Sequence, residues 1–214
     1  MKLYTFFRSS ASYRVRIALN LKGLSYEQAA IHLRRGGGEQ LMPAYRAINP
    51  QALVPALEDD GRILTQSLAI IEYLDETHPN PPLLPKNPAD KALVRAMALV
   101  IACEVHPIQN LRVLKHVKAA YDQTDEQVNR WAQHWIELGL SALQEMIVAQ
   151  PTRGKFCFGD TPTLADICLV PQLGNARRYD CDLSKYPAIL EIERNCNAIA
   201  AFTNAAPEKQ PDAE

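Results

Sequence analysis

Between residues 80 and 88 the chain carries four prolines, at positions 81, 82, 85 and 88. Each proline fixes its own φ and lacks the N–H group that a helix or a sheet would use. A regular element cannot run through such a stretch, which is therefore expected to be a linker. Strand and helix signals alternate before it, whereas only helical signals follow it. The sequence thus predicts an α/β domain over residues 1–83 and an all-helical domain over residues 89–214.

The first predicted domain alternates strands with helices. Apolar residues at intervals of three and four indicate the helices, and short apolar runs that end at turn-forming residues indicate the strands. Asp60-Gly61, between two such runs, is typical of a β-hairpin. The expected elements are a strand at 3–7, a helix at 10–22, a strand at 26–33, a glycine-bearing loop at 34–38, a short helix over about 40–48, strands at 53–57 and 62–65, and a helix at 67–78.

Every element predicted beyond the linker is a helix. Trp131 and Trp135 lie on one stripe of the third of these helices and are expected in the core. Thr163 and Asp166 have the spacing of a capping box, which is favoured over a catalytic role for Asp166. The polar tail from residue 206 on is expected on the surface. The predicted helices span 89–105, 108–121, 125–149, 167–176 and 187 to about 200.

The composition excludes several classes of partner. The 214 residues include 23 basic and 24 acidic side chains, a net charge of −1, which argues against a nucleic-acid or anionic-membrane surface. No apolar run approaches the ~18 residues that cross a bilayer, so no membrane span is expected. The five cysteines are odd in number and irregularly spaced, which favours a packing role in a reducing cytoplasm. The histidines form no metal-ligand pattern, so no metal site is expected.

Ser9 and Ser10 lie where the first predicted strand gives way to the first predicted helix. A helix N-terminus exposes unpaired N–H groups and the positive end of the helix dipole. An anion held there, including a thiolate, is stabilised, and a serine hydroxyl can donate one more hydrogen bond to it. The alternative interpretation is that either serine is only an N-cap.

Two other features of the first domain could also bind part of a peptide or an anion. If the Val54-Pro55 bond is cis, the backbone of Val54 faces outward and can pair with an extended peptide. Gln66-Ser67 begins a second helix and offers a second N-terminus for a carboxylate. An extended tripeptide with a central thiol and terminal carboxylates would fit these points. Taken singly each feature is ordinary, since Pro55 can be trans and Ser67 can be only a cap.

Several motifs then point to one family. The most specific is Ser-Ser-Ala-Ser-Tyr-Arg-Val-Arg-Ile-Ala-Leu at 9–19. The others are Asn-Pro at 49–50, Val-Pro at 54–55, Gln-Ser-Leu-Ala-Ile-Ile-Glu-Tyr-Leu at 66–74, Pro-Ile-Gln-Asn-Leu at 107–111, Gly-Asp at 159–160, Thr-Leu-Ala-Asp at 163–166 and Gln-Pro-Asp at 210–212. Through them essentially the whole chain resembles the class zeta glutathione transferases, the maleylacetoacetate isomerase family.

The resemblance implies a thioredoxin-like N-terminal domain, an all-α C-terminal domain, a homodimer and glutathione as cosubstrate. It also implies that Ser9 faces the glutathione sulfur. The residues that the family pattern places around glutathione are Ser9, Ser10, Ala11, Ser12, Arg14, Gln40, Val54, Gln66, Ser67, His106, Asn110 and Arg112. The family usually has cysteine at position 11. Alanine there leaves thiolate activation by Ser9 intact, but it casts doubt on side activities such as dehalogenation of α-haloacids.

The implied reaction is cis-to-trans isomerisation of a maleyl double bond conjugated to a ketone. It requires a thiolate at neutral pH, hydrogen-bond donors for the charge that develops on the ketone, and clamps for the substrate carboxylates. Arginine suits the clamp because its fork binds both carboxylate oxygens. Arg8 adjoins Ser9, and Arg178 matches a family position for a second carboxylate contact, so both are predicted as catalytic-site residues beside Ser9. Arg112 is a third candidate.

The sequence is compatible with two substrates. Gln109-Asn110-Leu111 resembles the maleylacetoacetate enzymes, whereas His106 and Arg112 resemble bacterial maleylpyruvate isomerases of the same family. Maleylacetoacetate, from aromatic amino-acid catabolism, is the first prediction and maleylpyruvate the alternative. A general glutathione transferase and a non-catalytic binding module of the same fold are further alternatives. The binding module is disfavoured because the serine and the arginines are retained.

Overall fold

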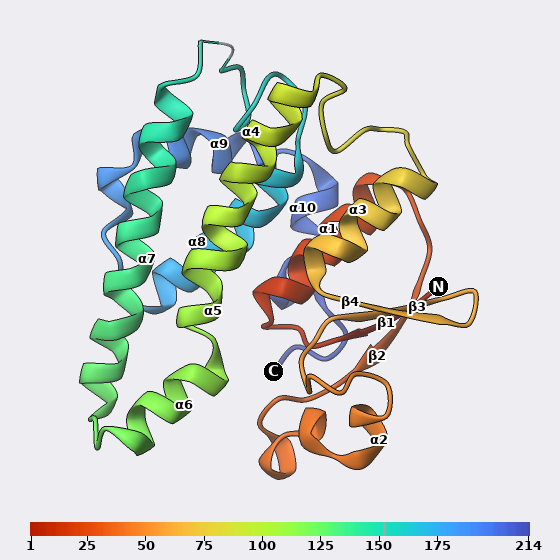
Figure 1. Cartoon of the computed structure of the whole chain (residues 1–214), viewed down its shortest axis with the longest axis vertical. Coiled ribbons are helices and arrows are strands. Elements are labelled where there is room, and N and C mark those ends of the chain that lie inside the picture. Colours follow the sequence, from red (N-terminus) through yellow and green to blue (C-terminus); the bar gives the residue numbers. More distant parts are fainter. Residues whose placement is uncertain (152) are drawn as a thin grey trace. The chain divides into compact units, whose positions relative to one another are not determined.

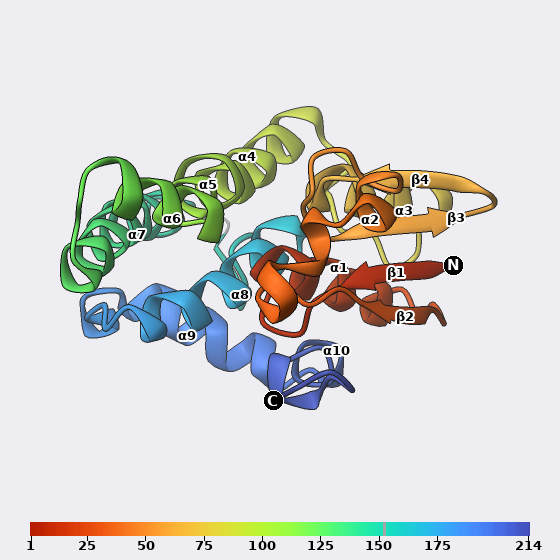
Figure 2. The same cartoon turned by 90° about the horizontal axis from the view of Figure 1, so that it is seen from below.

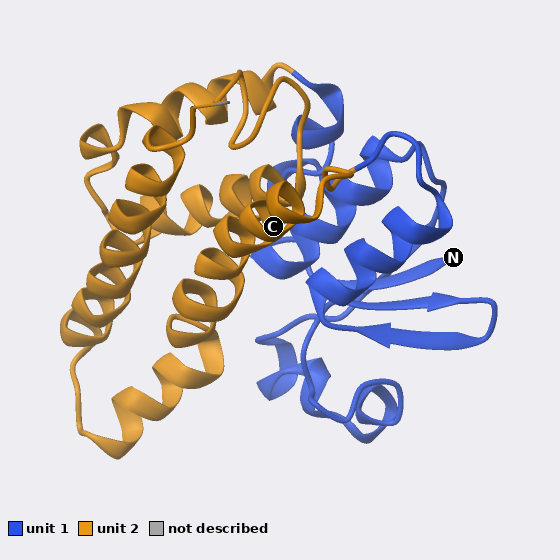
Figure 3. Cartoon of the chain, turned by 45° about the horizontal axis from the view of Figure 1, so that its top comes forward, with its two compact units in different colours: residues 1–82, 199–214 blue, residues 83–198 orange. Residues whose placement is uncertain are grey.

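The computed structural model describes residues 1–151 and 153–214, and their contacts divide the chain into two units. The first unit comprises Met1–Pro82 together with Ile199–Glu214, and the second comprises Leu83–Ala198 (Figure 3). The division falls inside the predicted linker. The predicted helical domain of 89–214 differs from the second unit at its C-terminal end, because residues 199–214 pack on the first unit.

A mixed four-stranded sheet in the order β2-β1-β3-β4 forms the centre of the first unit (Figure 1). The parallel neighbours β1 and β2 pair Leu3 with Gln28, and the antiparallel neighbours β1 and β3 pair Leu3 with Leu57. Asp60 and Gly61 both have positive φ, as the tight hairpin between β3 and β4 requires. The strands are β1 Lys2–Thr5, β2 Glu27–Ala30, β3 Ala56–Asp59 and β4 Arg62–Thr65.

Two helices supply most of the apolar packing in this unit. Helix α1, Ser10–Leu21, contacts both α3, Ser67–Thr77, and the short α10, Ala200–Thr203. Figure 2 shows α1 between the other two. The side chains with at most 1% exposure in this core include Leu3, Ile17, Leu19, Leu57, Ile70, Ile71 and Leu74. The segment between β2 and β3 holds two 3₁₀ turns, Arg35–Gly37 and Glu39–Leu41, and α2, Pro43–Arg46.

The second unit is helical throughout, as predicted. The predicted first helix is present as α4 and a π-helical turn, and the chain stays helical through Pro107 into α5. The capping box is confirmed, but α8 begins earlier and ends later than the predicted 167–176. The elements are α4 Pro88–Leu99, the π turn Val100–Val105, α5 His106–Ile108, α6 Leu111–Ala120, α7 Asp125–Val148, α8 Leu164–Arg178, a 3₁₀ turn Leu183–Lys185 and α9 Pro187–Asn197.

The tryptophan stripe of α7 does not form the core, so that prediction is wrong. Trp131 is 37% exposed, Trp135 is only partly buried, and Leu138 is 55% exposed. The core face of α7 is a neighbouring stripe formed by Val128, Ala132, Ile136, Gly139, Leu140, Leu143 and Ile147. At Gly139 a Cβ atom would lie 2.1 Å from Val105 Cγ2, so this face of α7 packs closely enough to require glycine there.

The stretch from Pro88 to Ala120 meets the length and composition of a membrane-spanning helix, so the expectation of no such run is wrong on those two criteria. It is not one uninterrupted helix, since it comprises α4, the π turn, α5 and α6, and Asn110 caps α6. Core helices of soluble proteins meet the same two criteria. Four cysteines are buried, as their predicted packing role requires, and Cys103 is exposed.

The C-terminal segment is anchored to the first unit, and from residue 206 on it lies largely on the surface, as predicted, except at the buried Ala206 and Gln210. Tyr13 Oη donates to Phe202 O at 3.1 Å, and Asn20 Nδ2 donates to Ala201 O at 3.1 Å. Gln210 is buried, and its amide nitrogen donates to Ala206 O at 2.8 Å. Hydrophobic patterning could not reveal this anchoring, because the segment is held through polar groups.

Candidate functional site

Ser9 is the N-cap of α1. Its backbone is extended, with φ −71° and ψ 116°, and its Oγ accepts the Ser12 N–H at 3.2 Å. The N-cap interpretation is therefore confirmed, but it does not displace the anion-binding interpretation. A hydroxyl has two acceptor lone pairs and one donor hydrogen, and the cap uses only a lone pair. The Ser9 O–H can still donate, at the positive end of α1.

The residues after Ser9 differ in their exposure. Ser10 and Ser12 are buried, and Ala11 is partly exposed. The Ser12 hydroxyl oxygen is buried and has no hydrogen-bond partner among the described residues. A buried polar atom in this condition costs free energy unless a ligand or water completes it. Arg8, directly before Ser9, is exposed and is therefore accessible to a substrate.

Arg14 joins the two helix N-termini that sequence analysis selected. Its side chain lies on α1 at 1% exposure, and Nη1 donates to Ser67 Oγ at 3.3 Å. Ser67 is the first residue of α3. The structure therefore brings Arg14 and Ser67 together, as predicted for residues of one peptide-binding site, which is called the cradle below. A guanidinium in this position makes the region positive, which suits the carboxylates of a peptide thiol.

Gln66, the N-cap of α3, has an unusual backbone. Its φ is 68° and its ψ is 116°, a conformation that residues other than glycine rarely adopt. Its Nε2 donates to Gln51 Oε1 at 2.9 Å. Residues held this way concentrate at ligand-binding positions, where the surrounding structure compensates the cost of about 1–3 kcal/mol. The backbone of Gln66 therefore supports its predicted role.

The peptide bond between Val54 and Pro55 is cis, which meets the condition set by the sequence. The loop before it is held from the side by two donors to Leu53 O, Tyr45 Oη at 2.7 Å and Asn49 Nδ2 at 2.8 Å. Burial raises the pKa of Tyr45 to about 12, so its hydroxyl stays a donor at neutral pH. Sequence analysis missed Tyr45 and, apart from the Asn49-Pro50 motif, the role of Asn49.

Gln40 is 9% exposed and has an incomplete set of partners. Its Nε2 donates to Leu33 O at 3.4 Å, whereas its buried Oε1 has no partner in the described part of the chain. Such an oxygen can accept an N–H of a ligand. This amide oxygen and the Ser12 hydroxyl are thus two buried polar groups that a bound peptide could pair with. A peptide has the N–H donors that this oxygen lacks, so the residues present fit it.

In the second unit, three of the predicted residues surround the turn between α5 and α6. Asn110 caps α6, with Oδ1 accepting the Arg112 N–H at 3.2 Å. Arg112 is exposed in the first turn of that helix, and His106 is partly buried at the end of the π turn. Gln109, which is buried, donates from Nε2 to Gln172 Oε1 of α8 at 2.9 Å and so fixes this turn.

Arg177 and Arg178 end α8 but have different partners. Arg177 places both terminal nitrogens on Glu193, at 2.6 and 2.5 Å, and this hydrogen bonding raises the pKa of Arg177. Arg178 donates from Nη1 to the amide oxygen of Asn175 at 3.1 Å and is exposed. Arg177 is thus committed to a carboxylate of the protein, and Asn175 is one of the groups that orient Arg178.

Asp166 is a structural residue and not a catalytic one. It is completely buried, and it accepts the Thr163 N–H at 2.8 Å, the Thr163 hydroxyl at 2.7 Å and the Cys157 N–H at 2.8 Å. Burial raises the pKa of Asp166, and these hydrogen bonds oppose the rise. A carboxylate with its oxygens engaged in this way starts α8 and is inaccessible to a substrate.

Comparison with known proteins agrees with this geometry. Residues 3–82 match the family model of the glutathione S-transferase N-terminal domain, and residues 114–194 match that of the C-terminal domain. A probable maleylacetoacetate isomerase of Vibrio cholerae is 50% identical over 211 residues, which cover 99% of this chain and 97% of that protein.

Two solved structures resemble the chain over its full length and theirs. A holo maleylpyruvate isomerase, a bacterial zeta-class glutathione S-transferase, is 46% identical with a TM-score of 0.97. A maleylacetoacetate isomerase of Methylobacterium extorquens AM1 with bound malonate and glutathione is 39% identical with a TM-score of 0.96. The mixed sheet and the helical unit are thus the thioredoxin-like and all-α domains of the glutathione transferase fold. The chain belongs to the glutathione S-transferase family, in the zeta class that includes the maleylacetoacetate and maleylpyruvate isomerases.

Proposed function

We propose that this chain is a glutathione-dependent cis–trans isomerase that converts maleylacetoacetate to fumarylacetoacetate. The observation that carries the proposal is Ser9, whose Oγ caps α1 through a lone pair and keeps its O–H for an anion at the helix N-terminus. When bound, glutathione supplies a thiolate that adds reversibly to the maleyl double bond and permits rotation about it. The role of the chain is to hold that thiolate and the substrate carboxylates.

The energetics of the Ser9 position suffice for a thiolate at neutral pH. A hydrogen bond to a charged group contributes about 1.5–3 kcal/mol, and the helix N-terminus adds about 0.3–1 kcal/mol. Since 1.36 kcal/mol corresponds to one pKa unit, the pKa of a thiol near 8.5 falls by about 1–3 units. At pH 7 the ionised fraction of the thiol then rises from about 3% to between about 25% and 97%. Ser9 holds the charge without taking a proton.

The remaining predicted residues have two roles in this proposal. Arg14, Gln40, Val54, Gln66 and Ser67 hold the peptide part of glutathione. They do so through the guanidinium of Arg14, the unpartnered amide oxygen of Gln40, the backbone of Val54 and the N-terminus of α3. We assign Arg178 and Arg8 to the substrate carboxylates, because a guanidinium fork matches a carboxylate and both side chains are exposed. Asn175 orients Arg178.

A second substrate, maleylpyruvate, is favoured by a specific observation. Two further basic side chains, His106 and Arg112, lie on either side of the Gln109–Asn110 turn. Maleylpyruvate is shorter than maleylacetoacetate and carries its second carboxylate next to the ketone. Additional cationic groups therefore suit it better than they suit maleylacetoacetate.

The discriminating experiment assays the purified protein with maleylacetoacetate and with maleylpyruvate, each with and without glutathione. We expect isomerisation of both only with glutathione, with the higher kcat/KM for maleylacetoacetate. A higher kcat/KM for maleylpyruvate would assign the second function. If glutathione is conjugated to electrophiles while neither maleyl compound is isomerised, the protein is a general transferase and the proposal is wrong.

We infer further that the enzyme is a cytoplasmic homodimer. The family resemblance supports the dimer, as does the apolar Ile63, which is 39% exposed on the edge strand β4. Four of the five cysteines are buried as free thiols, which suits a reducing compartment. Light scattering at micromolar concentration tests the dimer, and a monomer mass would contradict it.

A further inference from the structure

The C-terminal tail reaches the turn that carries Arg8 and Ser9. Asp212 Oδ2 accepts the backbone N–H of Phe7 at 3.0 Å, across 205 positions of sequence. Phe7 is also held on its other side, because Arg16 Nη2 donates to its carbonyl oxygen at 2.9 Å. Both peptide units that flank Phe7 are therefore fixed. The next two residues are the proposed substrate clamp and the proposed thiolate donor.

Arg16 is the buried centre of this arrangement. It is completely buried in α1, and Nε donates to Ala205 O of the C-terminal segment at 3.0 Å. Nη1 donates to Thr5 Oγ1 at 3.0 Å and to Phe6 O at 3.4 Å. Burial lowers the pKa of Arg16 to about 10, whereas nearby Tyr26, Asp212 and Tyr13 oppose the fall, so it stays charged at neutral pH. One guanidinium thus joins β1, the turn that carries Arg8 and Ser9, and the C-terminal segment.

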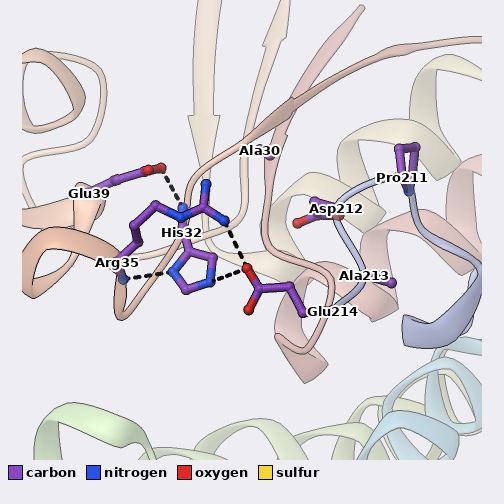
Figure 4. A pocket seen from close by; sticks show the side chains of 8 residues that line it. All are labelled: Ala30, His32, Arg35, Glu39, Pro211, Asp212, Ala213 and Glu214. Atoms are coloured by element: carbon purple, nitrogen blue, oxygen red, sulfur yellow. Dashed lines mark hydrogen bonds and ion pairs between the residues drawn. The ribbon is translucent and has the colours of Figure 1, made fainter.

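The end of the tail has a second anchor, shown in Figure 4. Glu214 Oε1 lies 2.8 Å from Arg35 Nη2 and 3.2 Å from His32 Nε2. His32 Nδ1 accepts the backbone N–H groups of Arg34 and Arg35, whereas Nε2 lies within ion-pair distance of Glu214 without the geometry of a hydrogen bond. Asp212 thus lies between the buried Gln210 and Glu214, which is ion-paired at the surface.

His32, Arg35 and Glu214 also line a half-open pocket of about 360 Å³ beside the tail. Glu39, whose Oε2 accepts the backbone N–H of His32 at 2.7 Å, also lines this pocket. Asp212 both lines this pocket and accepts a hydrogen bond from Phe7, in the turn that carries Arg8 and Ser9. Contacts on both sides of Asp212 restrict the backbone that carries its carboxylate. The carboxylate can therefore hold the Phe7 N–H in a defined position.

We propose that Asp212 is a positioning residue that, together with Arg16, sets the conformation of the Phe7–Ser9 turn and hence the placement of the Ser9 hydroxyl. This inference rests on the proposed function, because its readout is isomerisation. Asp212 touches neither substrate nor glutathione in this scheme. Its carboxylate fixes the Phe7 N–H, and the turn then places the donor.

The test compares Asp212→Ala and Asp212→Asn with a control, Glu208→Ala, which removes an exposed carboxylate from the same tail. We expect Asp212→Ala to lower kcat about tenfold, with the KM for glutathione within about twofold of the wild type. Asp212→Asn keeps an oxygen that can accept the Phe7 N–H and should recover most of kcat. Glu208→Ala should match the wild type.

The kinetic constants are measured well below each variant's melting temperature, so that a purely structural role would leave kcat unchanged. A folded Asp212→Ala enzyme with wild-type kcat overturns the inference. If that variant does not fold, Glu214→Ala decides, since its side chain is 56% exposed and it loosens the same tail. A two- to threefold lower kcat in Glu214→Ala then supports the inference, and an unchanged kcat overturns it. A wild-type enzyme without isomerase activity would instead contradict the proposed function.

Discussion

The two units present their proposed site residues in different ways. In the thioredoxin-like unit several polar groups are buried and held by neighbours, as Arg14 is by Ser67 and Arg16 by four oxygens, whereas Arg8 and Gln66 are exposed. In the helical unit the basic groups stand at helix ends and are exposed or half-buried, as Arg112 and Arg178 are. A buried polar group costs free energy if its partner is removed, whereas an exposed one does not.

This difference separates two kinds of function. Substitutions in the buried cradle should impair glutathione binding and folding together, so little variation is tolerated there. Substitutions at the exposed helix ends should change the dicarboxylate preference and leave stability nearly unaltered. The chemistry common to the class therefore belongs to the first unit. The choice between maleylacetoacetate and maleylpyruvate belongs to the second.

The largest expected effect concerns the cradle. Ser9→Ala removes the proposed donor to the thiolate and the cap of α1 together. We expect kcat/KM to fall by about 10²–10³, as on loss of a donor to a developing anion, and the free energy of unfolding to fall by about 1 kcal/mol. Ser9→Thr keeps both the acceptor and the O–H and serves as the matched control. An unchanged rate in Ser9→Ala would mean that the thiolate is activated elsewhere.

The next effect concerns the exposed arginines at the end of α8. Arg178→Ala should raise the KM for the dicarboxylate about 10- to 100-fold, because a charged partner of the substrate is lost. Arg177→Ala is the control, since it breaks the Glu193 pair and should lower the melting temperature slightly without changing KM. Steady-state kinetics at saturating glutathione check both. Equal KM values in the two variants would remove Arg178 from the clamp.

The sequence alone predicts much of the cradle because its signals are local. The helix predicted at 10–22 is observed at Ser10–Leu21, and the strand at 62–65 is observed within the same bounds. Caps, tight turns and short-range periodicity determine these elements over a few residues. The boundary between the two units can likewise be predicted from the sequence, because each proline near residue 82 restricts its own backbone.

The sequence could not predict what depends on distant contacts. Which of two stripes of α7 faces the core depends on contacts with distant residues, such as that of Gly139 with Val105, and the pattern of apolar residues on the helix does not reveal it. The partnership of Asp212 with Phe7 joins residues at opposite ends of the chain. The Gln-Pro-Asp motif at 210–212 was the one signal of it, and it carried no indication of the partner.

A smaller effect is expected from the loop that leads to Gln40. In Gly38→Ala a Cβ would lie 2.6 Å from Gln40 Nε2 and 2.7 Å from Oε1, so the amide must move. We expect a several-fold higher KM for glutathione and a loss of about 1 kcal/mol from the positive φ of 118°. Gly36→Ala is matched, because its φ is also positive but no atom lies within 4 Å of the added Cβ. It should lose stability and keep KM. A similar rise in KM in both variants would attribute the effect to the loop and not to Gln40.

The smallest expected effect is a pH dependence of the loop before Val54. The pKa of Tyr45 is raised from 10 to about 12 in the folded chain, chiefly by burial. A folded-state pKa above the unfolded value means that Tyr45's contribution to stability is complete below pH 10 and is lost as the pH rises towards 12. The melting temperature of the wild type should therefore fall over that interval.

Tyr45→Phe isolates this contribution from those of the other tyrosines. The variant loses the hydrogen bond to Leu53 O, about 1 kcal/mol at neutral pH, but it should show a shallower alkaline decline. The two melting curves should therefore converge between pH 10 and 12. If they instead run parallel over that interval, ionisation of Tyr45 is not coupled to the fold.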